Sequence, residues 1–304
     1  MISNPIPWPN GAKCAACITF DMDADSLIHI AHPADGHKRV SALSMLKYGP
    51  EIAVPRIVET YRELGLKQTF FIPAWCIENY PQAIDSILKG GHEIAHHGYL
   101  HEHPSELSDE GETYWLERGI EVIKSATGQT PRGWRAPLYN FSHRSADLLI
   151  ERGFSYDASL MGDDQPYFLK SSQGKIVEIP SHWGMDDWPQ YVQSIDLDYM
   201  MPIRSPRSGW EIFEQEFEAA YEFGGLWIPV LHPFATGRLS RWRVVREFLV
   251  SILERRDVWF APMEDIADHV RKVTEAGDWQ PRIDRIPYYK STVIPAGSRQ
   301  VLHP

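Results

Sequence analysis

Features that are scarce or missing narrow the class of protein before any motif is considered. The 304 residues include only three cysteines, which fits a reducing cytoplasm better than a secreted, disulfide-built fold. The N-terminal stretch MISNPIPWPNGAKCAAC has prolines where a secretory signal needs an unbroken apolar segment. No apolar run approaches the length of a membrane span. We therefore expect a cytoplasmic protein without a membrane partner.

The charge balance also excludes some partners. The formal net charge is −11 and no basic cluster is present, so nucleic acid and anionic membrane surfaces are not expected partners. Hydrophobic residues make up 43% of the chain and charged residues 23%, which is ordinary globular composition. A chain of this length can bury one large core.

Cys14 and Cys17 form a C-x-x-C, but no second pair follows. In an extended strand, residues three apart point to opposite faces. We therefore interpret both cysteines as strand filling, not as a zinc or redox site.

Strands and helices alternate along nearly the whole chain, which predicts an α/β fold with a parallel sheet or barrel wrapped by helices. No repeat or linker divides it, so residues 1–274 are expected to form one catalytic domain. Residues 24–50 show little periodicity and are predicted to be a long loop near the active site, of the kind that often serves as a lid. Residues 275–304 are rich in proline and are predicted to be an extension that packs on the barrel or on a neighbouring subunit.

The stretch GHEIAHHGYLHEH at 91–103 is the richest in metal-binding side chains. His97 and His101 are four apart, a spacing that lets two imidazoles converge on one ion if the backbone makes a helical turn. Zinc normally takes at least three protein ligands, and the stretch AACITFDMDAD at 15–25 supplies a carboxylate.

Five chemically capable residues follow predicted strands on their carboxyl side: Asp21, Asp23, His97, Arg135 and His232. In parallel α/β folds, ligands sit beyond the carboxyl ends of the strands. This shared placement is the strongest physical argument for one active site.

The motifs FDMDADS, HHGYLHEH, RAPLYNF, YDASLM and LHP resemble, in order and approximate spacing, those of the polysaccharide deacetylase family, also called carbohydrate esterase family 4. The resemblance covers roughly residues 12–270 and is strongest to the branch with peptidoglycan deacetylase-like proteins, allantoinase-like ureide hydrolases and cyclic imidases. It implies a distorted (β/α) barrel, expected to have seven strands, and one divalent metal ion, usually zinc. Two histidines and one aspartate with open positions also suit cobalt, manganese or nickel. The resemblance further implies a homo-oligomer, with a tetramer expected.

Residue by residue, the resemblance implies that Asp23, His97 and His101 are the metal ligands. Asp21 matches the general base, Arg135 the residue that orients this base, and His232 the general acid. The backbone near Leu138 and Tyr139 corresponds to a segment that helps to stabilise the oxyanion.

Two ambiguities in these assignments remain open. Most family members have adjacent aspartates in the first motif, whereas Met22 separates Asp21 from Asp23, so the base and the ligand could be exchanged. His92 and His96 are also four apart and offer a shifted ligand pair.

The remaining candidates have two interpretations each. Residues 182–188, HWGMDDW, place Asp186 and Asp187 among aromatics, Trp183 included, where they could contact substrate or tune His232, although a plain loop over a packed tryptophan fits as well. The histidines of the 24–50 segment could contact substrate or a second subunit, or be surface residues: His29, His32 and His37. Glu93 and Glu102 flank the metal histidines and could support them.

The set of base, ligands, arginine and acid predicts a metal-dependent hydrolase of non-peptide carbon–nitrogen bonds, and it speaks against a catalytically silent binding protein. Without an export signal, a small linear or cyclic amide, imide or ureide is the expected substrate. The alternative is N-deacetylation of an acetylated amino sugar, peptidoglycan or another glycan.

Overall fold

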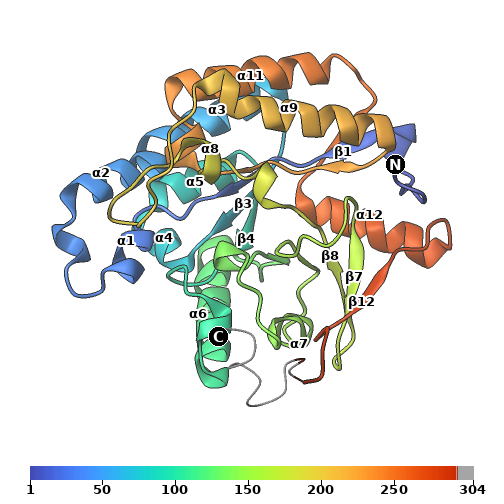
Figure 1. The fold of residues 1–304 in the computed structure, drawn as a ribbon, viewed down its shortest axis with the longest axis horizontal. Helices are drawn as coiled ribbons and strands as arrows, with labels where there is room; N and C mark the ends of the chain where they lie inside the picture. The colour runs from blue at the N-terminus through green and yellow to red at the C-terminus, as the bar shows by residue number, and fades with distance from the viewer. Residues whose placement is uncertain (292, 294–304) are drawn as a thin grey trace, which may run out of the picture.

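The computed structural model describes residues 1–291 and 293. Its main sheet has the strand order β10-β2-β3-β4-β5-β6-β8-β7-β12 (Figure 1). The strands from β10 to β8 are parallel to their neighbours, whereas β7 is antiparallel to β8. Their bounds are β2 Thr19–Asp21, β3 Thr69–Ile72, β4 Glu93–His96, β5 Gly133–Trp134, β6 Tyr156–Asp157, β7 Tyr167–Lys170, β8 Lys175–Glu178, β10 Val230–Leu231 and β12 Ile283–Arg285.

A second sheet contains two strands that come shortly before β2 and β10 in the chain, and one later strand. It has the order β11-β1-β9, with bounds Val258–Phe260, Cys14–Ala16 and Leu226–Trp227. A parallel bridge between Asp186 and Val230 joins the segment after β8 to β10. The α/β fold and its barrel-type architecture are confirmed. The expected count of seven strands is not, because the described residues form sheets of nine and three strands.

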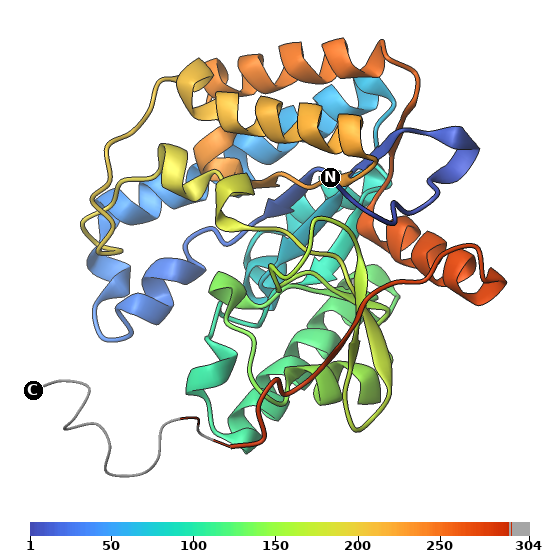
Figure 2. The ribbon, with the colours of Figure 1, turned by 45° about the vertical axis from the view of Figure 1, so that its right-hand side comes forward.

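Helices cover the outside of the barrel. Their bounds are α3 Val54–Leu64, α4 Ala74–Asn79, α5 Pro81–Lys89, α6 Asp109–Thr127, α7 Ser145–Glu151, α8 Trp188–Tyr191, α9 Pro206–Phe223, α10 Pro233–Thr236, α11 Leu239–Leu253 and α12 Met263–Ala276. Helices α9 and α11 pack side by side (Figures 1 and 2). Ser108 caps α6 by accepting a hydrogen bond from the Gly111 N–H at 3.1 Å, which offsets one of the unpaired donors of the first turn. No described helix has the length and apolar character to cross a bilayer.

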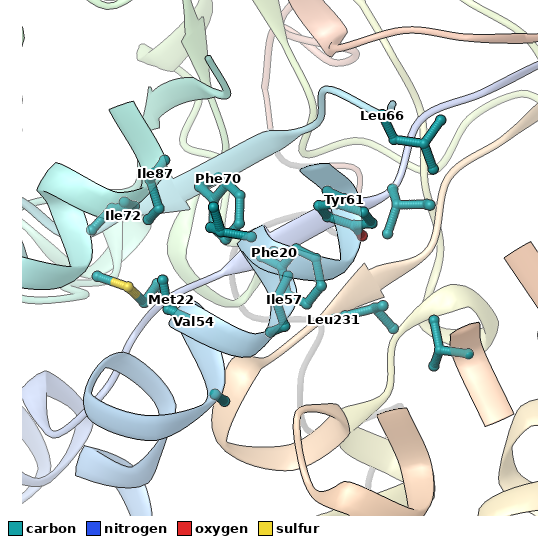
Figure 3. Packing of buried hydrophobic residues seen from close by; sticks show 14 of the residues in the cluster. Phe20, Met22, Val54, Ile57, Tyr61, Leu66, Phe70, Ile72, Ile87 and Leu231 are labelled. Carbon is teal, nitrogen blue, oxygen red and sulfur yellow. The ribbon is translucent and has the colours of Figure 1, made fainter. Parts of the chain in front are cut away.

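Alternate residues of the central strands point into the core between the sheet and the helices. Phe20 and Phe70 stack with centroids 5.1 Å apart and pack near Ile57 and Tyr61 of α3 (Figure 3). Each is fully buried, and burying one such side chain stabilises the fold by about 1.5–3 kcal/mol. The opposite face of β2 is therefore left to its polar neighbours, Thr19 and Asp21.

Cys14 and Cys17 are buried packing residues of the strand region, as predicted. All three are free and buried, and Cys14 and Cys17 belong to different hydrophobic clusters. Burial raises the pKa of the Cys14 thiol to about 12, so this thiol stays protonated. The C-x-x-C is structural.

The prediction that residues 24–50 form a long loop is wrong, because most of this segment is helical. It forms α1 (Ser26–Ala31) and α2 (Val40–Tyr48). Leu27, Ile28 and Leu46 pack in a small cluster with Phe234. Each helix is short and the PADG turn separates them, so neither is long enough to show a helical period.

The C-terminal extension packs, where it is described, on its own chain. Strand β12 pairs with β7 in parallel, and the two run alongside each other (Figures 1 and 2). The rest of the predicted 275–304 extension, residue 292 and residues 294–304, lies outside the described residues.

Candidate active site

Asp23, His97 and His101 converge at one point beyond the strand ends. Asp23 Oδ1 lies 3.3 Å from His97 Nε2, and Asp23 Oδ2 lies 3.6 Å from His101 Nε2. All three side chains are buried, and each offers a ligand atom within 4.8 Å of the other two. Asp23 Oδ1 is buried without a hydrogen-bond partner, which is unfavourable unless a cation or water satisfies it. These residues therefore fit a divalent ion of the zinc type.

A further contact fixes the orientation of His97. Its Nδ1 lies 2.8 Å from the Arg135 carbonyl oxygen, to which it donates. This places the proton on Nδ1 and leaves the Nε2 lone pair facing Asp23, as a metal-binding imidazole requires.

The backbone that carries the two histidines is not the helical turn that their spacing suggested. Gly98 has φ 74° and His101 has φ 64°, both in the left-handed region. Glu102 organises this turn by accepting hydrogen bonds from the Tyr99 N–H at 2.9 Å and the Leu100 N–H at 2.8 Å. A Cβ on Gly98 would lie 2.9 Å from Glu102 Oε1, so glycine is required here for space as well as conformation.

Asp21 is held by a buried arginine beneath the site. Arg135 Nη1 donates to Asp21 Oδ1 at 2.5 Å and to Thr19 Oγ1 at 3.0 Å, and Nε donates to the Ala158 carbonyl at 3.1 Å. The guanidinium also lies 4.0 Å from the Phe71 ring centroid. The second oxygen of Asp21 is 3.7 Å from His97 Nε2. Asp21 therefore keeps one oxygen on the arginine and the other towards the metal-ligand cluster.

His232 faces the same point from the end of β10, the strand that pairs with β2. Its Nε2 lies 3.5 Å from Asp23 Oδ2, and its Nδ1 lies 2.7 Å from Asp187 Oδ1. Burial opposes a charge on this imidazole, but Asp187, Asp23 and Asp186 together outweigh it, so the pKa of His232 is raised.

The expected substrate contact of Asp187 is contradicted. The Asp187 N–H donates to the Val230 carbonyl at 3.0 Å, which places this residue beside β10. Its side chain is fully buried, accepts hydrogen bonds from the His232 N–H and the Thr236 hydroxyl, and does not line the cavity. Asp187 supports His232, the other role considered for it.

The neighbouring residue, Asp186, lines the cavity instead. Its Oδ2 accepts a hydrogen bond from the Tyr139 hydroxyl at 2.8 Å, and its Oδ1 accepts one from the Trp188 N–H at 2.8 Å. Burial raises the pKa of Asp186 to about 6. The sequence did not separate the two aspartates, because only the pairing with β10 decides which of them turns inward.

Tyr139 and Trp183 both line the cavity, with ring centroids 4.8 Å apart. The Tyr139 N–H donates to the Ala136 carbonyl at 2.9 Å, so it is not free for an oxyanion, and the predicted role of the backbone near Leu138 and Tyr139 stays a prediction for the rest of that segment. What Tyr139 and Trp183 offer a ligand is side-chain surface.

The shifted histidine pair is excluded. His96 Nε2 lies 3.1 Å from the Leu116 carbonyl oxygen, and His96 Nδ1 accepts a hydrogen bond from the Gly98 N–H at 3.0 Å. Burial lowers the pKa of His92 and of His96 to about 4. Both are structural. Glu93 is also remote, because it accepts hydrogen bonds from Thr69 and Tyr156 inside the barrel.

The site opens into a cavity of about 1130 Å³. His32 forms part of its wall, but His29 and His37 do not. Residues 195–199 form another part, joined to the α1 side by His32 Nε2 at 2.6 Å from the Asp196 carbonyl oxygen and by the Arg39–Asp196 ion pair at 2.7 Å. This wall could not be predicted from the sequence, because residues 195–199 carry no periodicity or motif.

Comparison with known proteins identifies the family. A crystal structure from Mycobacterium smegmatis, of a protein assigned to the polysaccharide deacetylases, is 37% identical, covers 97% of this chain and 99% of its own, and superposes with a TM-score of 0.87. The chain belongs to the polysaccharide deacetylase family. The family model for polysaccharide deacetylases matches residues 36–156, which include His97, His101 and Arg135.

One further relative and one further solved structure are similar to this chain over most of its length. The peptidoglycan deacetylase of Helicobacter pylori is 26% identical over 84% of this chain and 96% of its own length. The crystal structure of the allantoinase PuuE is 23% identical over 88% of this chain and 94% of its own, with a TM-score of 0.77. At that identity the allantoinase shows the shared fold alone.

Proposed function

We propose that this protein is a metal-dependent hydrolase of non-peptide carbon–nitrogen bonds that acts on a small linear or cyclic amide, imide or ureide. The observation that carries the proposal is the convergence of Asp23, His97 and His101 with Asp21 and His232 around one cavity.

The site residues have distinct roles in this proposal. Asp23, His97 and His101 would hold the ion, which supplies Lewis acidity and a water of lowered pKa when bound. Asp21 accepts the proton of the attacking water on its Oδ2, since Oδ1 is held by Arg135.

His232 then donates a proton from Nε2 to the leaving nitrogen. Asp187 holds the opposite ring nitrogen at 2.7 Å, which orients the imidazole and stabilises its protonated form. The two proton-transfer groups stand on neighbouring strands, Asp21 at the end of β2 and His232 directly after β10.

N-deacetylation of an acetylated amino sugar is the second candidate. This candidate is favoured by the Helicobacter pylori relative, which is named a peptidoglycan deacetylase and is matched over 96% of its own length. Both candidates use the same groups, because each breaks an amide bond.

A substrate panel separates the two candidates. We expect the zinc-loaded protein to hydrolyse succinimide, hydantoin or allantoin, or a simple acetanilide, faster than an N-acetylglucosamine oligomer, and a chelator to remove the activity. Faster turnover of the sugar oligomer would reverse the order of the candidates. Chelator-insensitive turnover would contradict the metal-dependent mechanism.

A further inference from the structure

The cavity has an unbalanced charge. Among the described residues that line it there is no lysine or arginine, whereas seven are acidic. Three of these, Asp21, Asp23 and Asp186, surround the reacting position, and the others stand further out. The outer ones are Glu102, Glu106, Asp196 and Asp198.

Several of these carboxylates are compensated. Arg135 pairs with Asp21, and Arg39 pairs with Asp196 from outside the lining. The proposed metal ion would offset Asp23. Two carboxylates remain in contact with solvent at the cavity, Glu106 and Asp198, and both are exposed. Neither contacts a lysine or arginine of the lining; Glu106 lies 3.4 Å from His103 Nδ1, a partner that is charged only when protonated.

The uncharged part of the lining combines aliphatic side chains with four aromatic ones. Tyr139, Trp183, Trp188 and Tyr199 all face the cavity. Aromatic faces carry partial negative charge and attract cations, so they add to the field of the carboxylates. An anionic substituent of a ligand would meet carboxylates and ring faces without a lysine or arginine to pair with, and the one protonated imidazole of the proposed mechanism, His232, is already paired with Asp187.

We propose that this cavity selects amides whose non-reacting part is uncharged or cationic over amides that carry a carboxylate there, with Glu106 and Asp198 as specificity-determining residues. The proposal rests on the amide-hydrolase function above and narrows its substrate class. Each exposed carboxylate is expected to change the affinity for a unit charge about two- to fivefold at low salt, because solvent screens it. The combined preference for the cation over the anion should be about tenfold or more.

The test uses three phenylacetohydroxamic acids that differ only in the para substituent: aminomethyl, ethyl or carboxymethyl. Each compound carries the same hydroxamate, so the affinity that they share reports binding at the metal site. The ratio of their dissociation constants reports the selection by charge. Calorimetric titration of the zinc-loaded protein should rank them aminomethyl, ethyl, carboxymethyl. At about 1 M salt, where the Debye length is about 3 Å, the ratios should shrink.

The variant Glu106→Gln/Asp198→Asn should reduce the ratio between the ammonium and the carboxylate compound several-fold. Asparagine tolerates the left-handed backbone of residue 198, where φ is 50°, so the change removes charge without adding strain. Asp164→Asn is the matched control, because Asp164 is exposed but does not line the cavity.

Equal affinity of the three compounds would overturn the selection while turnover of a neutral amide still supported the proposed function. An unchanged ratio in the double variant would overturn the assignment to Glu106 and Asp198. The proposed function itself is judged by chelator-sensitive turnover, a separate readout.

Discussion

Asp21→Asn is expected to lower kcat/KM for amide hydrolysis by about 10²–10⁴ while the protein still binds its metal ion. Asparagine keeps an oxygen for Arg135, whose Nη1 lies 2.5 Å from the Asp21 Oδ1 of the native chain. It cannot accept a proton at neutral pH, so the step assigned to Oδ2 is lost. The measurements are steady-state kinetics and metal content per chain.

The matched comparison is Asp23→Asn, which should lose the metal ion that Asp21→Asn retains. Asp23 lies 3.3 Å from His97 Nε2, 3.6 Å from His101 Nε2 and 3.5 Å from His232 Nε2, whereas Asp21 is tied to an arginine. If Asp21→Asn lost the ion and Asp23→Asn retained it, the two aspartates would have exchanged roles. Full activity of Asp21→Asn would exclude it as the base.

Arg135→Met is expected to destabilise the protein by about 3–5 kcal/mol, because it leaves the Asp21 charge buried without its partner. Arg135 is fully buried and donates to Thr19, Asp21 and the Ala158 carbonyl. Methionine has a similar length and preserves the packing on Phe71, so the loss reports the charge and hydrogen bonds. Urea unfolding midpoints measure it.

A nearby arginine provides the control for this prediction. Arg132 pairs with Asp268 at the surface, and its side chain is 38% exposed, so Arg132→Met should cost about 1 kcal/mol or less. Combining Arg135→Met with Asp21→Asn should cost less than the sum of the two single changes, because the second removes the charge that the first leaves unpaired. Additive losses would show that the two side chains do not act as a pair.

The alternation of strands and helices predicted the most important feature of the site. Asp21, Asp23, His97 and His232 stand at different points of the chain, yet parallel strands bring their carboxyl ends to one edge and one cavity. Arg135 lies directly beneath Asp21 for the same reason. The two opposite faces of an extended strand likewise predicted the separation of Cys14 from Cys17.

Features that depend on tertiary contacts could not be predicted. The spacing of His97 and His101 suggested a helical turn, but Gly98, Glu102 and a positive φ at His101 give a different backbone that still brings the imidazoles together. Asp187 turns towards His232 because residues 186 and 187 run beside β10, a pairing with no local signature.

The walls of the cavity were the least predictable part of the site. Helices α1 and α2 are too short to show a period, and their apolar residues find their partner in Phe234, far along the chain. Residues 195–199 are held by contacts of Asp196 with His32 and Arg39, which are equally remote in sequence. The candidate site residues at the strand ends were therefore visible in the sequence, while the walls of the cavity were not.

In the proposed mechanism, one metal ion held by Asp23, His97 and His101 is required for hydrolysis. The most direct measurement is a zinc titration of the metal-free protein that follows bound metal and amide hydrolysis together. Both should saturate at about one ion per chain, and His97→Ala should lose both. Hydrolysis that persists without metal, or an ion bound equally well by His97→Ala, would contradict the account.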